Sequence, residues 1–387
     1  MPAERDDPPV DEVRPDGFPA GFGSGPAEAD AILLLRCLLG ISPRALHEVV
    51  WRTGSARAAV HAIEVGADGT DNDRAFLRTA EPRAIRERLA DVDGRFVVPG
   101  HPEYPPSLDR LTDPPVGLFL RGRSLEPGHQ RVAVVGSRRP SGLGADVAWD
   151  LGRGLAAAGA VVTSGGAIGI DARAHEGALA VGGTTVCVLG SGIDVLYPAT
   201  NRRLLEEIVE RGTLVSEYPP GIPAEPFRFP ARNRLIAALS LGVVIVEGSE
   251  RSGTRSTADY ADQVGIEVFA VPGPVTSALS AAPHALIRDG ARLIRGADDL
   301  LEDLGLEAVD LSVALDGLAP AHRSALEALD TPMLPEHLAH AAGLAVPEAV
   351  AALTHLEILG LVTGSGGRYR RTVQVVSPGP DATHEAG

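Results

Sequence analysis

Short apolar runs that each end in a glycine-rich turn repeat along the middle of this chain, and they restrict its fold more than any other feature. The runs RVAVVG (131–136), AVVTSGG (160–166) and TTVCVLG (184–190) are each followed by a stretch with helical spacing of apolar residues. A strand buried on both faces is a continuous apolar run, and strands that alternate with helices are typical of a parallel sheet covered on both faces. LVSEYPPG, LGVVIVEGS and VFAVPG add three more short strands. We therefore predict an α/β fold with a Rossmann-like parallel sheet as its core.

Changes in residue pattern divide the 387-residue chain into several parts, as expected for a length that exceeds one ordinary domain. Helical spacing dominates before the apolar runs. After them come three short helical stretches and the hairpin-like GLVTGSGGRYRRTVQVV, which together predict a winged helix. We predict a disordered tail (1–26), a small helical domain (27–95), the Rossmann-like domain (96–304), a linker (305–317), the winged-helix domain (318–376) and a second disordered tail (377–387).

The basic residues narrow the possible chemistry, because all 35 of them are arginine and the sequence has no lysine. This excludes the Walker phosphate loop and lysine Schiff bases, whereas arginine can still grip phosphate with two hydrogen bonds. HExxH, cysteine-cluster and GxSxG motifs are also missing, so we expect no metal site and no serine hydrolase chemistry. The net charge of −16 does not exclude a local basic groove.

Several features indicate a cytoplasmic protein. No apolar run approaches the roughly 20 residues that span a bilayer, and the acidic, proline-rich N-terminus is neither a signal nor a transit peptide. The two cysteines, Cys37 and Cys187, both lie in apolar surroundings, which agrees with a reducing compartment.

The glycine loops that end the apolar runs are the strongest candidates for a ligand site. Ligands of open parallel sheets bind beyond the carboxyl ends of the strands, where the amino end of the following helix favours anions. Three such loops side by side would form a phosphate cradle without lysine, although tight turns also need glycine for packing alone. The candidate residues in the first two loops are Gly136, Ser137, Arg138, Arg139, Ser164, Gly165 and Gly166.

Charged residues near the predicted strand ends have both structural and functional interpretations. Arg232 and Arg234 follow Pro230, and we expect them to stand at the same edge as the loops; the alternative is an arginine that is only solvated or loosely paired. Asp171 and His175 share one helix face, where a structural hydrogen bond is favoured over acid–base chemistry. For Glu247, at the end of an apolar strand, we favour a neighbouring arginine as the partner.

Taken together, these motifs resemble the DNA-processing protein A (DprA, also called Smf) family. The resemblance runs in order from VPGHPEYPPSLDRLTDPPVGLFLRG through VAVVGSRRPSGLG, SGGAIGIDARAHEGAL, LGSGIDVLYPATNRRLLEEI, LVSEYPPG, FPARNRLIAALS and VVIVEG to FAVPG, and covers roughly residues 98–296. The helical N-terminal part, which is SAM-like or helix-hairpin-helix-like, and the winged C-terminal part resemble the family more loosely. In the turn GISPRAL a plain helix-to-helix turn is favoured over a DNA-backbone grip.

The resemblance implies a cytoplasmic, usually dimeric protein that binds single-stranded DNA and has neither catalytic activity nor a cofactor. Members protect incoming strands in natural transformation and help to load a RecA-type recombinase. The family binds DNA through a GSR loop and an FPxRNR motif, which correspond here to Ser137, Arg138, Phe229, Arg232, Asn233 and Arg234. Four arginine–phosphate contacts predict a logarithmic salt slope of roughly −3.

Some positions depart from the family pattern or concern base contacts. Ala231 stands where many members have a basic residue, and Arg255 could compensate for it. SAAPHALI (280–287) lacks the glycine and asparagine that many members carry. Phe227 and Phe229 are the candidates for base stacking, and we expect at least one of them to be buried instead.

Two other functions remain open at this point. A nucleotide phosphoribohydrolase could use the same glycine-loop sheet, with Glu247 and Arg234 beside the sugar. A winged-helix transcription regulator would need specific duplex binding. However, the expected recognition helix VPEAVAALTHLEIL contains Glu348 and Glu357 and no arginine, which favours a partner-binding or regulatory role over reading of the major groove.

Overall fold

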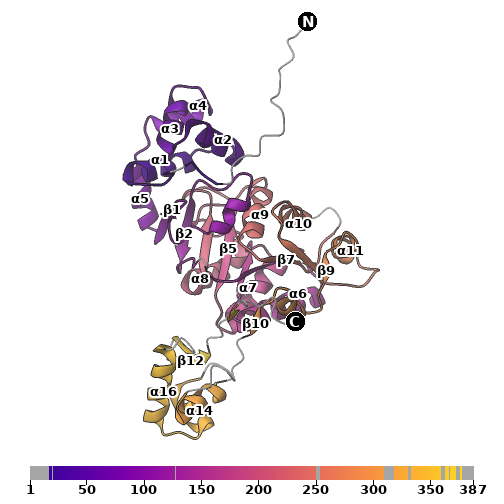
Figure 1. Ribbon diagram of the computed structural model, residues 1–387. Coiled ribbons are helices and arrows are strands. Elements are labelled where there is room, and N and C mark those ends of the chain that lie inside the picture. Colours follow the sequence, from indigo (N-terminus) through magenta and orange to yellow (C-terminus); the bar gives the residue numbers. More distant parts are fainter. Residues whose placement is uncertain are drawn as a thin grey trace, which may run out of the picture.

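The computed structural model describes residues 17–19, 21–126, 128–249, 253–308, 318–329, 333–358, 362–365, 367–371 and 375–376. A group of helices at the N-terminal end, a central α/β unit and a C-terminal unit follow one another along the chain (Figure 1). None of the helices within these ranges is long and apolar enough to cross a bilayer.

The central unit is built on a nine-stranded sheet with the order β1-β2-β6-β5-β4-β3-β7-β8-β9. The strands from β6 to β9 are parallel to one another, whereas β2 and β1 continue the sheet in antiparallel pairing. This confirms the predicted α/β class with a mainly parallel sheet. The strands are β1 (Gly94–Val97), β2 (Leu118–Gly122), β3 (Arg131–Val135), β4 (Val161–Ser164), β5 (Thr185–Leu189), β6 (Thr213–Ser216), β7 (Gly242–Ile245), β8 (Glu267–Ala270) and β9 (Arg292–Leu293).

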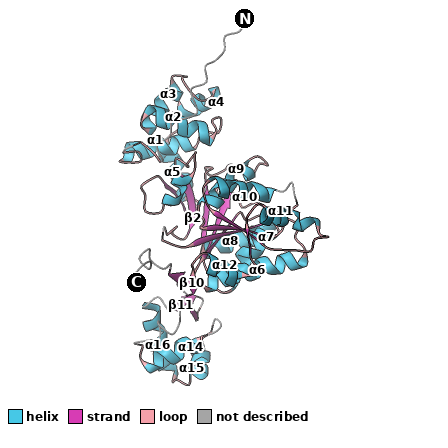
Figure 2. Ribbon diagram, turned by 45° about the vertical axis from the view of Figure 1, so that its right-hand side comes forward, coloured by secondary structure: helices cyan, strands magenta, loops and turns pink. Residues whose placement is uncertain are grey.

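Helices cover the sheet on both faces because its strands carry apolar side chains alternately to one face and the other (Figure 2). One face packs against α6 (Gly142–Ala157), α7 (Ile170–Ala180), α8 (Arg202–Arg211) and α12 (Ala297–Asp303). The other packs against α9 (Arg228–Ala238), α10 (Gly253–Gln263) and α11 (Ala281–Arg288). The short 3-10 helices are η1 (Pro106–Arg110), η2 (Ala199–Asn201) and η3 (Ala278–Ser280).

Glycine residues allow the backbones of α6 and α7 to approach each other closely. At Gly152 of α6 a Cβ would fall 2.1 Å from the carbonyl oxygen of Ala174, and at Gly177 of α7 it would fall 2.0 Å from that of Trp149. A larger side chain at either position would push α6 and α7 apart. These helices follow the glycine loops after β3 and β4.

The N-terminal helices form their own apolar core and also pack on the sheet. Serine and threonine side chains cap three of them, α2, α3 and α4: Ser42 and Ser55 accept hydrogen bonds from the first turns, and Thr70 forms a capping box with Asp73. The helices are α1 (Pro26–Arg36), α2 (Pro43–Thr53), α3 (Ala56–Glu64), α4 (Asp71–Leu77) and α5 (Pro82–Ala90).

Part of the segment expected to be a disordered tail is packed, which corrects that expectation for the described residues. Phe22 is buried in the core of the N-terminal helices, and its ring stacks on that of Phe18 with centroids 4.6 Å apart. The remainder, residues 1–16 and 20, lies outside the described residues, as do 309–317 of the expected linker and all of 377–387.

The C-terminal unit contains three helices and a two-stranded sheet, in which Val362–Ser365 (β11) pairs with Arg368–Arg371 (β12). A second short sheet pairs β10 (Glu307–Ala308), at the start of the expected linker, with β13 (Val375–Val376), so the chain returns to the central unit after the hairpin. The helices are α14 (Pro320–Ala328), α15 (Pro335–Ala342) and α16 (Val346–Ile358).

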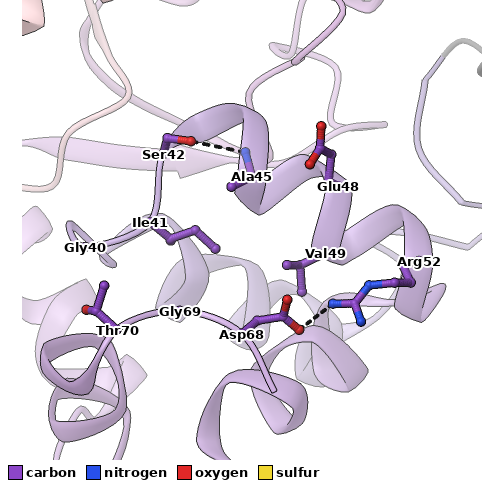
Figure 3. A pocket seen from close by; sticks show the side chains of 10 residues that line it. All are labelled: Gly40, Ile41, Ser42, Ala45, Glu48, Val49, Arg52, Asp68, Gly69 and Thr70. Atoms are coloured by element: carbon purple, nitrogen blue, oxygen red, sulfur yellow. Dashed lines mark hydrogen bonds and ion pairs between the residues drawn. The ribbon is translucent and has the colours of Figure 1, made fainter. Parts of the chain in front are cut away.

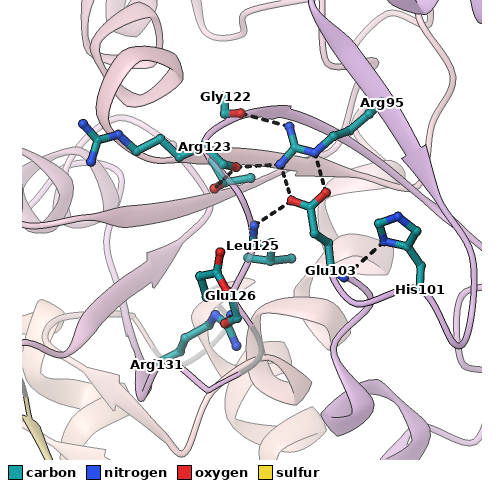
Figure 4. A network of polar contacts seen from close by, with 9 residues as sticks. Arg95, His101, Glu103, Gly122, Arg123, Leu125, Glu126 and Arg131 are labelled. Carbon is teal, nitrogen blue, oxygen red and sulfur yellow. Dashed lines mark hydrogen bonds and ion pairs between the residues drawn. The ribbon is translucent and has the colours of Figure 1, made fainter.

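A polar network links β1 to the loop between β1 and β2 and to the loop between β2 and β3 (Figure 4). The guanidinium of Arg95 donates two hydrogen bonds to the carboxylate of Glu103, of 2.7 and 2.6 Å, and others to the carbonyl oxygens of Gly122 and Arg123. Glu103 also accepts a hydrogen bond of 2.9 Å from the amide of Leu125. These bonds, and above all those from Arg95, lower the pKa of Glu103 from 4.5 to about 2.

We expect this network to make the free energy of unfolding depend on pH. A carboxyl whose pKa is lower in the folded state stabilises the fold above its unfolded pKa, and that contribution is lost as the pH falls. The variant Glu103→Gln should therefore be less stable than the wild type by about 1–2 kcal/mol at neutral pH. The difference should shrink as the pH falls from 4.5 toward 2, which urea unfolding at a series of pH values would measure. A difference that does not vary with pH would contradict this account.

Candidate nucleic-acid interface

The three glycine loops meet at one edge of the sheet, because β5, β4 and β3 are parallel neighbours. The amide of Ile170, after the second loop, donates a 3.1 Å hydrogen bond to the carbonyl oxygen of Ser137 in the first loop. Gly169 has φ +90°, and a Cβ there would lie 2.3 Å from that same oxygen. Ser164 closes the base of the second loop, since its hydroxyl donates to the carbonyl oxygen of Val134. The loops thus lie side by side at this edge of the sheet.

Two arginines project from the first loop. Arg138 and Arg139 are both exposed, and neither forms an ion pair with a carboxylate among the described residues. Ser137 Oγ accepts a 3.1 Å hydrogen bond from the amide of Arg139, which holds the loop in a compact turn. These two guanidinium groups are therefore available to phosphates.

An aromatic shelf, formed by Phe229 and Tyr197, lies beside Arg138. The Cζ atom of Arg138 is 5.3 Å from the centroid of the Phe229 ring, and the centroid of the Tyr197 ring is 5.7 Å from that of Phe229. Tyr197 is 49% exposed, Phe229 is half-buried, and Phe227 is 66% exposed. The expectation that one of the two phenylalanines is buried in the core is therefore wrong.

Tyr197 is the residue that sequence reasoning missed. Its signal was an aromatic residue just beyond the third glycine loop, in LGSGIDVLYP. The loops bring this ring to Phe229, which is 32 positions away in the sequence. An exposed ring and a half-buried one beside arginines without a carboxylate partner suit a single strand, whose bases stack while its phosphates pair.

Arg232 does not reach the surface of this edge, which corrects its expected placement. It is only 4% exposed, and its Nη1 atom donates to the carbonyl oxygens of Gly165, at 2.8 Å, and Val188. A Cβ on Gly165 would lie 2.3 Å from that nitrogen. Arg232 therefore supports the second loop from inside the fold, through its hydrogen bond to the carbonyl oxygen of Gly165.

Arg234 is also buried, so the expected position at the edge is wrong for it too. Its guanidinium donates two hydrogen bonds of 2.7 and 2.8 Å to the carboxylate of Glu217, and its Nε atom lies 3.4 Å from a carboxylate oxygen of Asp113. Arg36, the last residue of α1, lies 3.6 Å from Glu217. These four residues form an ionic cluster, buried except for the half-buried Asp113, that joins α9 to the N-terminal helices.

The remaining motif residues have structural partners. The Nδ2 atom of Asn233 donates a 2.9 Å hydrogen bond to Ser256 Oγ and another to the carbonyl oxygen of Gly253 at the start of α10. Arg255 lies 3.9 Å from Asp259 and 3.6 Å from Asp289, so its guanidinium already faces two carboxylates. A compensating role of Arg255 for Ala231 stays a prediction.

Asp171 and His175 make the structural hydrogen bonds that the sequence favoured. Asp171 accepts from the amide of Gly165 at 3.1 Å, and His175 Nδ1 lies 2.6 Å from Thr185 Oγ1. Because that hydroxyl donates to the carbonyl oxygen of Val162, the histidine nitrogen is the donor. Burial, helped by Arg232, lowers the pKa of His175 to about 3, so the ring is neutral and poorly suited to proton transfer near pH 7.

Among the described residues, Glu247 pairs with a serine and not with an arginine, contrary to expectation. Its two carboxylate oxygens accept hydrogen bonds from the amide and the hydroxyl of Ser141. The phosphoribohydrolase alternative needs Glu247 and Arg234 together at a sugar. Each of these side chains is instead engaged with other partners inside the fold.

A separate hollow of about 340 Å³ lies in the N-terminal helical unit beside the turn GISPRAL (Figure 3). Ser42 caps α2 there by accepting a 3.2 Å hydrogen bond from the amide of Ala45. The carboxylates of Glu48 and Asp68 line the hollow, and its arginine, Arg52, is paired with Asp68. Because Glu48 is also paired, with Arg44, the hollow offers no arginine free of a carboxylate to a phosphate backbone among the residues that line it.

Several known proteins are similar to this chain in sequence. The family model described as DNA recombination-mediator protein A matches residues 95–305. The chain is 38% identical over 281 residues to protein Smf of Escherichia coli, covering 69% of this chain and 75% of that protein. It is 42% identical over 200 residues to the DNA processing protein DprA of Streptococcus pneumoniae, covering 52% of this chain and 71% of that protein.

Two solved structures share the fold. The X-ray structure of DprA from Streptococcus pneumoniae superimposes with a TM-score of 0.54 at 33% identity, covering 68% of this chain and 99% of that one. A structure described as showing the single-stranded DNA binding mode of DNA processing protein A from Helicobacter pylori has a TM-score of 0.50 at 32% identity, covering 54% and 95%.

Proposed function

Because this chain belongs to the DNA recombination-mediator protein A (DprA) family, we propose that it binds single-stranded DNA in DNA processing, along the carboxyl edge of its sheet. The observation that carries the proposal is the grouping of Arg138, Arg139, Phe229 and Tyr197 at that edge. Unpaired guanidinium groups would meet phosphates, and the exposed rings would meet bases.

The residues divide into two roles in this proposal. Arg138 and Arg139 contact the strand directly, with Gly136 and Ser137 shaping their loop. Arg232, Asn233 and Arg234 act as positioning residues: the first supports the glycine loop at 165–166, and the other two hold α9 against its neighbours. Ser164, Gly165 and Gly166 form the supported loop itself.

Family membership supports several finer proposals. We propose that the protein protects incoming single strands in natural transformation, helps to load a RecA-type recombinase onto them, acts as a homodimer in the cytoplasm and catalyses no reaction. We also propose the division into domains at the boundaries given by the sequence, with 318–376 as a winged helix. The described part of α16 has no arginine, which supports a partner-binding role for that unit.

Salt dependence of binding tests the main proposal. Two exposed arginines, in place of the four expected from sequence, should contribute about −1.4 to the logarithmic salt slope, at about 0.7 per phosphate contact. The double variant Arg138→Ala/Arg139→Ala should flatten the slope by that amount and weaken binding to all sequences alike. Fluorescence anisotropy of a labelled oligonucleotide at several salt concentrations would measure both effects.

A matched variant controls for the loss of charge alone. Arg44→Ala/Arg83→Ala removes two exposed arginines from the N-terminal helices and should leave the slope unchanged. Duplex DNA of the same sequence should bind more weakly than the single strand. Equal binding of duplex, or an equal effect of the two double variants, would contradict the proposal.

A further inference from the structure

Glu247 lies where a Rossmann-like sheet ordinarily receives a phosphate. The sheet grows from β3 in both directions, through β4 on one side and β7 on the other, so the crevice beyond β3 and β7 is the topological switch point. The helix that follows β3 is α6, whose amino end favours an anion. Glu247 follows β7 after one residue and reaches across to this helix end.

The carboxylate is bound there as an anion would be. Its Oε2 atom accepts a 2.8 Å hydrogen bond from the amide of Ser141, and its Oε1 atom accepts one of 2.6 Å from the hydroxyl. That hydroxyl in turn accepts a 3.0 Å hydrogen bond from the amide of Gly144 in the first turn of α6. The amide and hydroxyl of Ser141, the N-cap residue of α6, are therefore bound by a carboxylate of the protein itself.

The carboxylate also fills the space. A Cβ on Gly144 would lie 2.4 Å from the carboxyl carbon of Glu247, so not even a methyl group fits between the helix and the side chain. A phosphate would need to occupy the same volume and the same donors. It cannot enter while Glu247 is in place.

Hydrogen bonds also hold both ends of the first loop, which carries Arg138 and Arg139. The loop is held at one end by the hydrogen bond from Ile170 to the carbonyl oxygen of Ser137, and at the other by the bonds from Ser141 to Glu247. Arg138 and Arg139 lie between these two anchors and are exposed. Both arginines of the loop are thus exposed, and the guanidinium of Arg138 lies over the ring of Phe229.

We propose that Glu247 is a built-in anion that takes the place of a phosphate at the amino end of α6 and so determines ligand specificity. It keeps mononucleotides and free phosphate out of the crevice and leaves the outer surface, with Arg138 and Arg139, for a polynucleotide. The exclusion follows from the site alone, whereas the part that concerns the polynucleotide rests on the proposed function.

Anion rescue of a truncated variant tests this specificity. Glu247→Ala removes the carboxylate and leaves an anion-sized space beside unpaired donors. Formate or inorganic phosphate should then stabilise the variant, with a rise in melting temperature of roughly 3 °C at about ten times the dissociation constant. Glu247→Gln fills the same volume without a charge, so neither it nor the wild type should respond. Chloride at equal ionic strength controls for general salt effects.

The proposal is overturned if neither anion stabilises Glu247→Ala, or if they stabilise Glu247→Gln and the wild type equally. If Glu247→Ala folds poorly, its refolding yield is measured with and without formate. A higher yield with formate supports the proposal, and a yield independent of formate counts against it. DNA binding by the wild type is measured separately by anisotropy. A wild type that fails to bind single strands contradicts the proposed function and leaves the anion response as an independent result.

Discussion

Replacing Arg234 by methionine should lower the free energy of unfolding by about 3–5 kcal/mol, the usual cost of breaking a buried ion pair from one side. Arg234 is 3% exposed, and its guanidinium pairs with both Glu217 and Asp113. Without it, the buried carboxylate of Glu217 would keep only Arg36, 3.6 Å away, and the partly exposed Asp113 would lose the guanidinium that lies 3.4 Å from it. Urea unfolding followed by circular dichroism would measure the loss.

Two variants separate the loss of pairing from the loss of a side chain. Arg234→Met/Glu217→Met removes one charge of each sign from the closest pair, so it should recover part of the stability, since apolar replacements of whole buried pairs are often tolerated. The recovery should be incomplete, because buried Arg36 then loses its 3.6 Å contact with Glu217. Arg295→Met removes the arginine of the exposed pair with Asp299 and should leave the urea midpoint unchanged. If Arg234→Met behaves like Arg295→Met, the cluster does not stabilise the fold.

Loss of the aromatic shelf should weaken single-stranded DNA binding without altering its salt slope. A base stacked on an aromatic side chain contributes about 1–3 kcal/mol, so Tyr197→Ala/Phe229→Ala should bind roughly 5- to 150-fold more weakly. The slope should persist because the variant removes no positive charge. Anisotropy titrations at several salt concentrations would report the affinity and the slope separately.

Tyr197→Phe is the matched control for this effect, because it keeps the ring and loses only the hydroxyl. It should bind like the wild type, whereas Tyr197→Ala alone should lose part of the affinity. A loss of equal size in Tyr197→Phe and Tyr197→Ala would show that the hydroxyl, and not stacking, is responsible. A flatter slope in the double variant would indicate that the rings act only by holding Arg138 in place.

The arginines illustrate how far the sequence could predict the candidate site. Arg138 and Arg139 follow a buried strand in a glycine loop, and the local pattern correctly placed them at the exposed edge. Arg232 and Arg234 lie in an equally basic run, but they belong to α9, which packs on the sheet. A helix turns its side chains around its axis, so the partners of Arg232 and Arg234 depend on elements that the run itself does not contain.

Partners that lie far apart in the sequence were the least predictable. Glu247 and Ser141 are 106 positions apart, and nothing near Glu247 distinguishes a serine at a helix end from an arginine as its partner. Tyr197 likewise gains its role from Phe229. The helical unit was recognised from its periodicity, whereas its attachment through Arg36 and Glu217 was not.

Local information in the chain was sufficient for the parallel sheet, the glycine loops at its edge and the family, because strand burial, turn geometry and the order of motifs are properties of contiguous residues. Folding assigned each charge its partner: two arginines to the interior, two to the surface, and a glutamate to the place of a phosphate. The physical reason is that the energy of a charge depends on its distance to other charges and to water, and those distances exist only after remote segments have packed together.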